Sequence, residues 1–196
     1  MQRARIRIVT WAVVAAMLVA VLAVAAPAFG QVPMETVVYR FYNQGTGAHF
    51  YTASAEERDY VIATWPSIFT YEGPAFAIFE EGWFPPELEP GRAPVHRFYN
   101  KVSKSHFYTI SAEEADMVKA KYPAVFSYDG VGFEAYTESN EWAPLMPVHR
   151  FYNKLNGSHF YTISPTEKAI VQIQYRDVYR YEGVSFYAIS YGMYAF

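Results

Sequence analysis

Hydrophobic and polar residues follow one pattern that occurs three times along the chain. Each copy begins with the aromatic stretch RFYN, passes through polar turn residues, and reaches the stretch HFYT, so that its Arg and His are nine residues apart. Short segments rich in β-forming aromatic residues and separated by a polar turn are typical of a β-hairpin. The copies cover residues 38–79, 95–136 and 148–188, which we call the first, second and third units.

A helix start follows each hairpin. The sequence Ser-x-x-Glu begins at Ser54, Ser111 and Ser164, and Pro165 takes the favoured first helical position in the third unit. This pattern predicts a capping box, in which the Ser oxygen accepts a backbone N–H and the Glu side chain reaches back to the Ser N–H. We expect a short helix with a buried stripe of apolar residues about one turn apart. The predicted stripe residues are Tyr60, Val61, Trp65, Met117, Val118, Tyr122, Ile170, Val171 and Tyr175.

The last part of each unit contains the motif Y-E/D-G between apolar segments, which predicts a strand, a bend at Gly and a further strand. From its Arg to this Gly each unit has the same length, whereas the Arg-to-Arg spacing is 57 and then 53 residues. Length therefore varies only at the joints between units. A unit of about 42 residues is too small to bury its aromatic residues alone. We expect a single α+β domain over residues 36–196, in which three tandem β-β-α-β(β) repeats form one compact pseudo-threefold body, with an open row as the alternative.

The first thirty residues have a different composition. Arg3, Arg5 and Arg7 precede an apolar run over residues 8–26 and then small residues. This arrangement predicts a secretory signal peptide over residues 1–30, with an uncleaved N-terminal membrane anchor as the alternative. In both cases the remaining chain is exported, so we expect a secreted or cell-envelope protein that contacts a membrane only through an uncleaved leader.

The charge of the chain argues against nucleic acid as a partner, and its lack of Cys excludes disulfides. Removing three Arg and no acid with the leader changes the formal net charge from −3 to −6, so nucleic acid is not an expected partner. The chain has no Cys, so an exported domain must be stabilised without disulfides. Aromatic residues make up 19% of the chain, and 18 of them are Tyr, whose hydroxyls need partners or water.

Arg40, Arg97 and Arg150 begin the hairpins in register. One interpretation is an internal ion pair with the acid of the Y-E/D-G motif, and the other is a ligand clamp in each unit. The acid recurs at constant spacing, which favours the ion pair. The structural ion-pair candidates are Glu72, Asp129 and Glu182.

His49, His106 and His159 each share a strand face with the Tyr two residues later. They are either structural His with hydrogen bonds to neighbouring groups, or part of a polar and aromatic rim around a ligand pocket. A third interpretation is a metal site formed by the three His, although no motif such as HExxH supports it. We expect no cofactor. The candidate ligand-binding residues are Arg40, His49, Tyr51, Arg97, His106, Tyr108, Arg150, His159 and Tyr161.

The full pattern R-F-Y-N…H-F-Y-T-x-S-x-x-E…Y-E-G-x-x-F resembles the repeat-containing domain of unknown function DUF5648 over about residues 36–190. This resemblance implies an exported module of bacteria and fungi that is often surface-associated or appended to an enzyme. It implies no activity and no site residues.

Motifs of nucleophilic, nucleotide-dependent and thiol catalysis are absent from the sequence. Every candidate polar residue occurs three times, and repeated weak sites gain affinity for a polymer by avidity. We therefore expect an exported non-catalytic binding module for extracellular carbohydrate or another cell-envelope polymer. The alternatives are a metal-dependent hydrolase that uses the three His, and a structural or protein-interaction module of the cell envelope.

Overall fold

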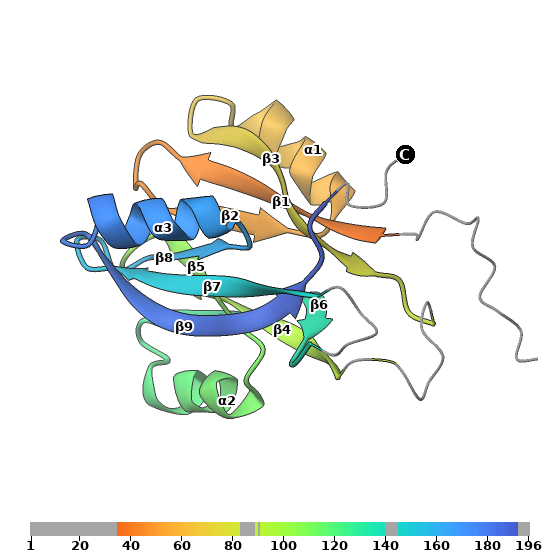
Figure 1. Cartoon of the computed structure of the whole chain (residues 1–196). Coiled ribbons are helices and arrows are strands. Elements are labelled where there is room, and N and C mark those ends of the chain that lie inside the picture. Colours follow the sequence, from red (N-terminus) through yellow and green to blue (C-terminus); the bar gives the residue numbers. More distant parts are fainter. Residues whose placement is uncertain (1–34, 83–88, 90, 140–144, 192–196) are drawn as a thin grey trace, which may run out of the picture. The chain divides into compact units, whose positions relative to one another are not determined.

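The structure, a computed structural model, describes residues 35–82, 89, 91–139 and 145–191, and the predicted leader lies outside these residues. The predicted α+β class is confirmed, since the order strand, strand, helix, strand occurs three times (Figure 1). The first unit contains β1 (Glu35–Asn43), β2 (His49–Thr52), α1 (Ala55–Thr64) and β3 (Phe69–Phe79). The second contains β4 (Arg92–Asn100), β5 (Ser105–Thr109), α2 (Ala112–Lys121) and β6 (Phe126–Tyr136). The third contains β7 (Met146–Asn153), β8 (His159–Thr162), α3 (Pro165–Gln174) and β9 (Tyr179–Ala188).

The first strand of each unit lies between the other two and pairs with both of them antiparallel. The first unit forms a three-stranded sheet in the order β2-β1-β3, and the other two form a six-stranded sheet in the order β5-β4-β6-β9-β7-β8. Tyr136 of β6 and Tyr187 of β9 are paired where the second and third units meet. Two backbone hydrogen bonds of 2.9 Å join Ala77 of β3 to Ile189 after β9. Sheet edges of different units are therefore connected through the backbone.

The Y-E/D-G motif forms a bulge inside one strand. In the first unit the pairing of β1 with β3 shifts register after Val38 and again after Arg40. Gly73 lies opposite Arg40 with a φ of 97°, a backbone conformation that L side chains rarely adopt. Gly130 and Gly183 have φ values of 94° and 108° in the same motif. The bend at Gly is therefore present, but the chain continues in the same strand and each unit is β-β-α-β.

The predicted helix caps are confirmed for the Ser oxygen and wrong for the Glu side chain. The Ser54 Oγ accepts the N–H of Glu57 at 3.0 Å, as expected. The Ser54 N–H donates instead to the Thr52 hydroxyl at 3.1 Å, and the Ser of the other two units does the same to Thr109 and Thr162. Because the Thr side chain already accepts this N–H, the Glu carboxylate is available for other partners.

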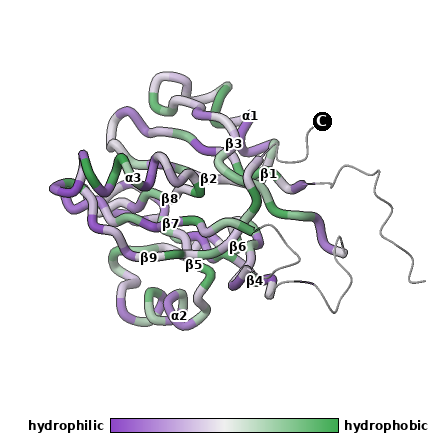
Figure 2. Tube along the Cα trace, viewed as in Figure 1, coloured by the Kyte–Doolittle hydropathy of each residue, from purple (hydrophilic) through white to green (hydrophobic). Residues whose placement is uncertain are grey.

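The predicted apolar stripe of the helices is largely wrong. Val61 is buried in α1, but Tyr60 and Trp65 are 55% and 39% exposed. In α2 and α3 the buried residues are Ala115, Val118 and Val171, whereas Tyr122 and Tyr175 are exposed. Each helix carries both hydrophilic and hydrophobic residues (Figure 2). The helices therefore cover the sheets through a narrow contact and leave apolar side chains exposed.

The buried residues form one large cluster and three small ones. The large cluster takes residues from all three units, and its rings Phe76, Phe133 and Phe186 lie 5.5–5.7 Å from one another. Each small cluster lies within one unit and includes the Phe of RFYN and the Phe of HFYT, as Phe41 and Phe50 do in the first. Both faces of each HFYT strand are thus buried, one in the shared core and one within its own unit. No helix in the described part of the chain has the length and apolar character needed to cross a membrane.

Candidate functional site

Each of the three recurrent Arg binds the helix-capping Glu of a different unit. Arg97 of the second unit donates to Glu57 of the first at 2.9 Å. Arg150 of the third unit binds Glu114 of the second through two hydrogen bonds of 2.8 and 3.1 Å. Arg40 of the first unit binds Glu167 of the third in the same way, at 3.0 and 2.9 Å. The three pairs therefore form a closed circuit around the units.

Burial and charge agree with this arrangement. The Arg side chains are only 17–19% exposed. Burial alone would raise the pKa of the Glu114 carboxyl, but the hydrogen bond from Arg150 holds it below the ordinary value. Arg40 lowers the pKa of Glu167 against the same burial penalty. Each Arg also lies over the Phe of its neighbour's HFYT stretch, as Arg97 does over Phe50 at 5.9 Å.

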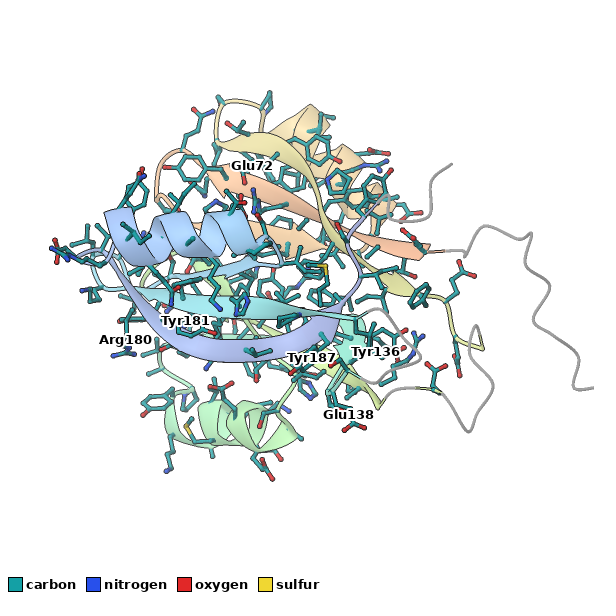
Figure 3. All side chains as sticks on the ribbon, in the orientation of Figure 1. Glu72, Tyr136, Glu138, Arg180, Tyr181 and Tyr187 are labelled. Carbon is teal, nitrogen blue, oxygen red and sulfur yellow. The ribbon has the colours of Figure 1, made fainter. Side chains whose placement is uncertain are left out.

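The acids of the Y-E/D-G motif meet the Arg of their own unit in two of three cases. The Arg40 Nε lies 2.7 Å from Glu72, which comes from β3 (Figure 3), and the Arg150 Nε lies 3.0 Å from Glu182. The Arg97 Nε is buried and has no hydrogen-bond partner among the described residues. The acid of that unit is Asp129, whose side chain is one methylene shorter than Glu.

The hydroxyls of Tyr51, Tyr108 and Tyr161 link the three HFYT strands. Each Tyr is fully buried, and its hydroxyl donates to the backbone carbonyl of another member and accepts that member's N–H. These six bonds are 2.7–3.0 Å long. Burial raises the pKa of all three hydroxyls, so they stay protonated and can donate. A ligand cannot reach these hydroxyls, because each is buried and already donates one hydrogen bond and accepts another.

The three His lie at the junctions between units. Each approaches the acid of its own Y-E/D-G motif through Nε2, at 3.3–3.5 Å. Each ring also packs 4.8–5.0 Å from the HFYT Phe of another unit. Burial, together with the positive charge of Arg40 or Arg97, lowers the pKa of His49 and His106 to about 4, so both rings are neutral at pH 7.

The three His do not form a metal centre. Among the described residues no group of three or more His, Asp or Glu side chains is arranged to hold a metal ion. The reason is that each His Nε2 faces an acid of its own unit rather than the other two His. The described residues therefore give no support to the predicted alternative ligand set His49, His106 and His159.

A pocket of about 330 Å³ lies where the hairpins of the first and second units meet. Aromatic rings and the two His provide much of its lining, and the Lys104–Ser105 segment of the second hairpin completes one side. The His49 Nδ1 is buried and lacks a hydrogen-bond partner in the described part of the chain. The lining residues are Asn43, Ala48, His49, Phe50, Trp65, Ile68, Phe69, Tyr99, Lys104, Ser105 and His106.

The acid of its own unit determines which ring nitrogen of His49 carries the proton. Its Nε2 faces the Glu72 carboxylate at 3.5 Å, so in the neutral ring the proton belongs on Nε2. The Nδ1 is then an acceptor with an unused lone pair. A buried acceptor without a partner is costly. The His49 ring lies 4.8 Å from Phe160 of the third unit, so this cost arises at the junction between the third and first units.

At the junction between the third and first units, longer side chains make contacts that the pocket region lacks. The Asn156 amide there donates to the Thr46 carbonyl across the junction at 2.8 Å. The Tyr179 hydroxyl is hydrogen-bonded to Asn153. The residues in register in the first unit are Thr46 and Phe69, which have neither a side-chain amide nor a phenol hydroxyl.

The family model for DUF5648, described as a domain of unknown function, matches residues 23–84 and 37–189. The chain belongs to the DUF5648 family. Comparisons with curated proteins and with solved structures found no match.

Sequence reasoning missed two parts of this DUF5648 domain. It did not assign the capping Glu residues as the partners of the Arg, although they recur at constant spacing as well. It also missed the pocket residues Trp65, Tyr99 and Lys104. The available signal was variation between units, because Trp65 corresponds to Tyr122 and Tyr175, and Lys104 corresponds to Gly in both other units.

Proposed function

We propose that this DUF5648 domain is an exported, non-catalytic binding module, and that the pocket between the first and second units binds a sugar ring of an extracellular or cell-envelope polymer. The supporting observation is the aromatic lining of the pocket together with polar lining residues such as Lys104, Ser105 and His106. Ligand pockets typically join apolar and aromatic walls with a few polar groups that fix orientation. A sugar ring offers an apolar face for the aromatic rings and hydroxyls for the polar lining residues.

The proposal assigns different roles to the nine candidate residues. Arg40, Arg97 and Arg150 and the three Tyr hold the units together, because their bonding groups face neighbouring units. His49 and His106 both line the pocket and contribute to the junction. His159 contributes to the junction between the second and third units through Phe107, at 4.9 Å.

We further propose that the three units are repeats arranged around a pseudo-threefold axis. The closed circuit of Arg–Glu pairs and the cyclic Tyr hydrogen bonds support this arrangement, since each relation recurs between every pair of units. We also propose that residues 1–30 direct export, which the basic and apolar sequence of that segment supports.

Isothermal titration of the purified full-length protein against soluble polysaccharides and cell-envelope fractions tests the binding function. Trp65→Ala should weaken binding about tenfold or more, and should lower the melting temperature no more than the control does, because Trp65 is a partly exposed pocket residue. Tyr122→Ala is the matched control, since Tyr122 is in register, 47% exposed and not part of the pocket lining. Binding to none of these polymers would count against the proposal.

A structural or protein-interaction module is the second candidate, favoured by how many recurrent polar residues make contacts between units. It predicts that Arg97→Ala and His106→Ala lower the melting temperature and that no polysaccharide binds. The binding module predicts that Arg97→Ala lowers stability, whereas His106→Ala weakens binding as well.

A further inference from the structure

Lys104 has a backbone conformation that is unfavourable for a Lys. Its φ is 54°, and no other non-glycine residue among those described has a positive φ. The residues in register in the first and third units are Gly47 and Gly157, with φ values of 70° and 74°. Gly adopts this conformation without steric cost, whereas Lys does not. The second unit therefore has the Lys104 side chain at a position where the backbone conformation is strained.

Lys104 lines the pocket, and its side chain forms no hydrogen bond or ion pair with any residue that the structure describes. The other Lys of the same turn differs in this respect. Lys101 donates from Nζ to the Pro123 carbonyl at 2.7 Å, and Lys154, which is in register with it, donates to the Arg176 carbonyl. Lys101 therefore supports its own unit, whereas Lys104 makes no such structural contact.

The acids nearest to the pocket are engaged elsewhere. Glu72 lies against His49 and forms an ion pair with Arg40, and Asp129 lies against His106. Both pocket His are neutral at pH 7 because burial lowers their pKa to about 4. Lys104 is thus the positive charge among the lining residues, and an anionic group in the pocket would meet no unpaired carboxylate from that lining.

We propose that the pocket binds an acidic sugar, whose negatively charged group pairs with the Lys104 ammonium while the sugar ring packs against the aromatic lining. This assignment rests on the proposed carbohydrate-binding function and adds the charge of the ligand. Charge-assisted hydrogen bonds are stronger than neutral ones, so the charged group makes a large contribution to affinity and selectivity.

Titration with matched ligands tests the charge requirement. The probes are a galacturonic acid tetramer, its fully methyl-esterified form, and glucose 6-phosphate against glucose. The free acid should bind roughly tenfold or more tightly than the ester, and the preference should shrink as salt is added. Tighter binding of glucose 6-phosphate than of the tetramer would identify the anion as a phosphate rather than a carboxylate and would still support the proposal.

Lys104→Gly separates this role from a structural one. The variant should be at least as stable as the original protein, because Gly suits the backbone, and should lose roughly tenfold or more of its affinity for the acid while binding the ester unchanged. Lys101→Gln, in the same turn, should retain the preference for the acid.

Two results would overturn the inference. If the acid and the ester bind equally, or if Lys104→Gly binds the acid as tightly as the original protein, the charge assignment fails while carbohydrate binding stands. If neither these probes nor any polysaccharide binds, the proposed function fails together with the inference.

Discussion

The guanidinium of Arg97 lies 2.9 Å from the carboxylate of Glu57, although the two residues belong to different units and are 40 positions apart. The Glu57 N–H also donates to the side chain of Ser54, the residue that caps α1. One residue thus fixes a helix start and anchors the next unit to it. Two further Glu residues have the same double role, Glu114 and Glu167.

Removing the negative charge of Glu57 should destabilise the domain. Glu57→Gln leaves the largely buried Arg97 without its carboxylate partner, so we expect a loss of about 2–3 kcal/mol in the free energy of unfolding. Urea denaturation followed by circular dichroism measures it. The control is Glu56→Gln, an exposed neighbour in the same helical turn, which should change stability by less than about 0.5 kcal/mol. Equal effects of the two substitutions would contradict the role of the cross-unit pair.

Asp129→Glu should stabilise the protein. The longer side chain can reach the unpaired Arg97 Nε, as Glu72 and Glu182 reach their own Arg. A gain of about 0.5–1.5 kcal/mol in the free energy of unfolding is expected, the net value of one hydrogen bond. Loss of stability in this variant would show that chain length is not what separates Asp129 from Arg97.

Tyr108→Phe should be among the most damaging single-atom deletions. It removes the hydroxyl that donates to the Tyr51 carbonyl and accepts the Tyr51 N–H, and both backbone groups are buried. A loss of about 2–4 kcal/mol is expected, since unpaired buried groups carry their full desolvation cost. The matched control is Tyr128→Phe, whose hydroxyl bonds His96 at the surface and whose side chain is 43% exposed. If Tyr128→Phe lowered the free energy of unfolding as much as Tyr108→Phe, the hydrogen bonds among the three buried Tyr would not be what stabilises the domain.

Stability should fall as the pH is lowered from about 6.5 to about 4. The folded-state pKa of His49 and His106 is lowered from 6.5 to about 4 by burial and by Arg40 and Arg97, so the unfolded chain binds more protons in this range. The stabilisation is fully present above pH 6.5 and is lost towards pH 4, by up to about 3 kcal/mol for each His. Below pH 4.5 the loss continues, because the pKa of Glu182 is about 2.

Urea unfolding at several pH values, on the original protein and on the double variant His49→Gln/His106→Gln, checks this dependence. The double variant should show a shallower slope between pH 6.5 and 4, whatever its stability at pH 7. An unchanged slope would mean that other groups bind the protons. The groups that face His49 are Arg40, Glu72 and Glu167, and those that face His106 are Arg97, Asp129 and Glu57.

Local features of the fold could be predicted from the sequence because each depends on neighbouring residues. The hairpins, the Ser caps and the bend at Gly73 follow from short patterns with a direct physical cause. The partners of Arg97 could not be predicted in the same way. In a sequence with three copies in register, Glu57 and Asp129 both recur at constant spacing, so spacing alone cannot distinguish a contact within a unit from one between units.

The pocket could not be predicted for a different reason. Its lining comes from the facing surfaces of two units, and the first unit has Thr46 and Phe69 where the third has Asn156 and Tyr179. These are differences among similar residues, and their effect appears only when the two surfaces are placed together. The recurrent residues therefore indicated the scaffold, whereas the exceptions among them indicated the candidate site.

The Tyr hydroxyl linkage has a consequence for how such a chain could arise. Its six hydrogen bonds do not involve the joints, so a homotrimer of unlinked single units could form the same contacts. In such an ancestor every substitution would appear three times, and a Lys at the turn or a Trp after the helix would be imposed on all copies. In one polypeptide a single copy can differ from the others, and Lys104 and Trp65 each occur in one unit while the Tyr bonding that unites the units occurs in all three.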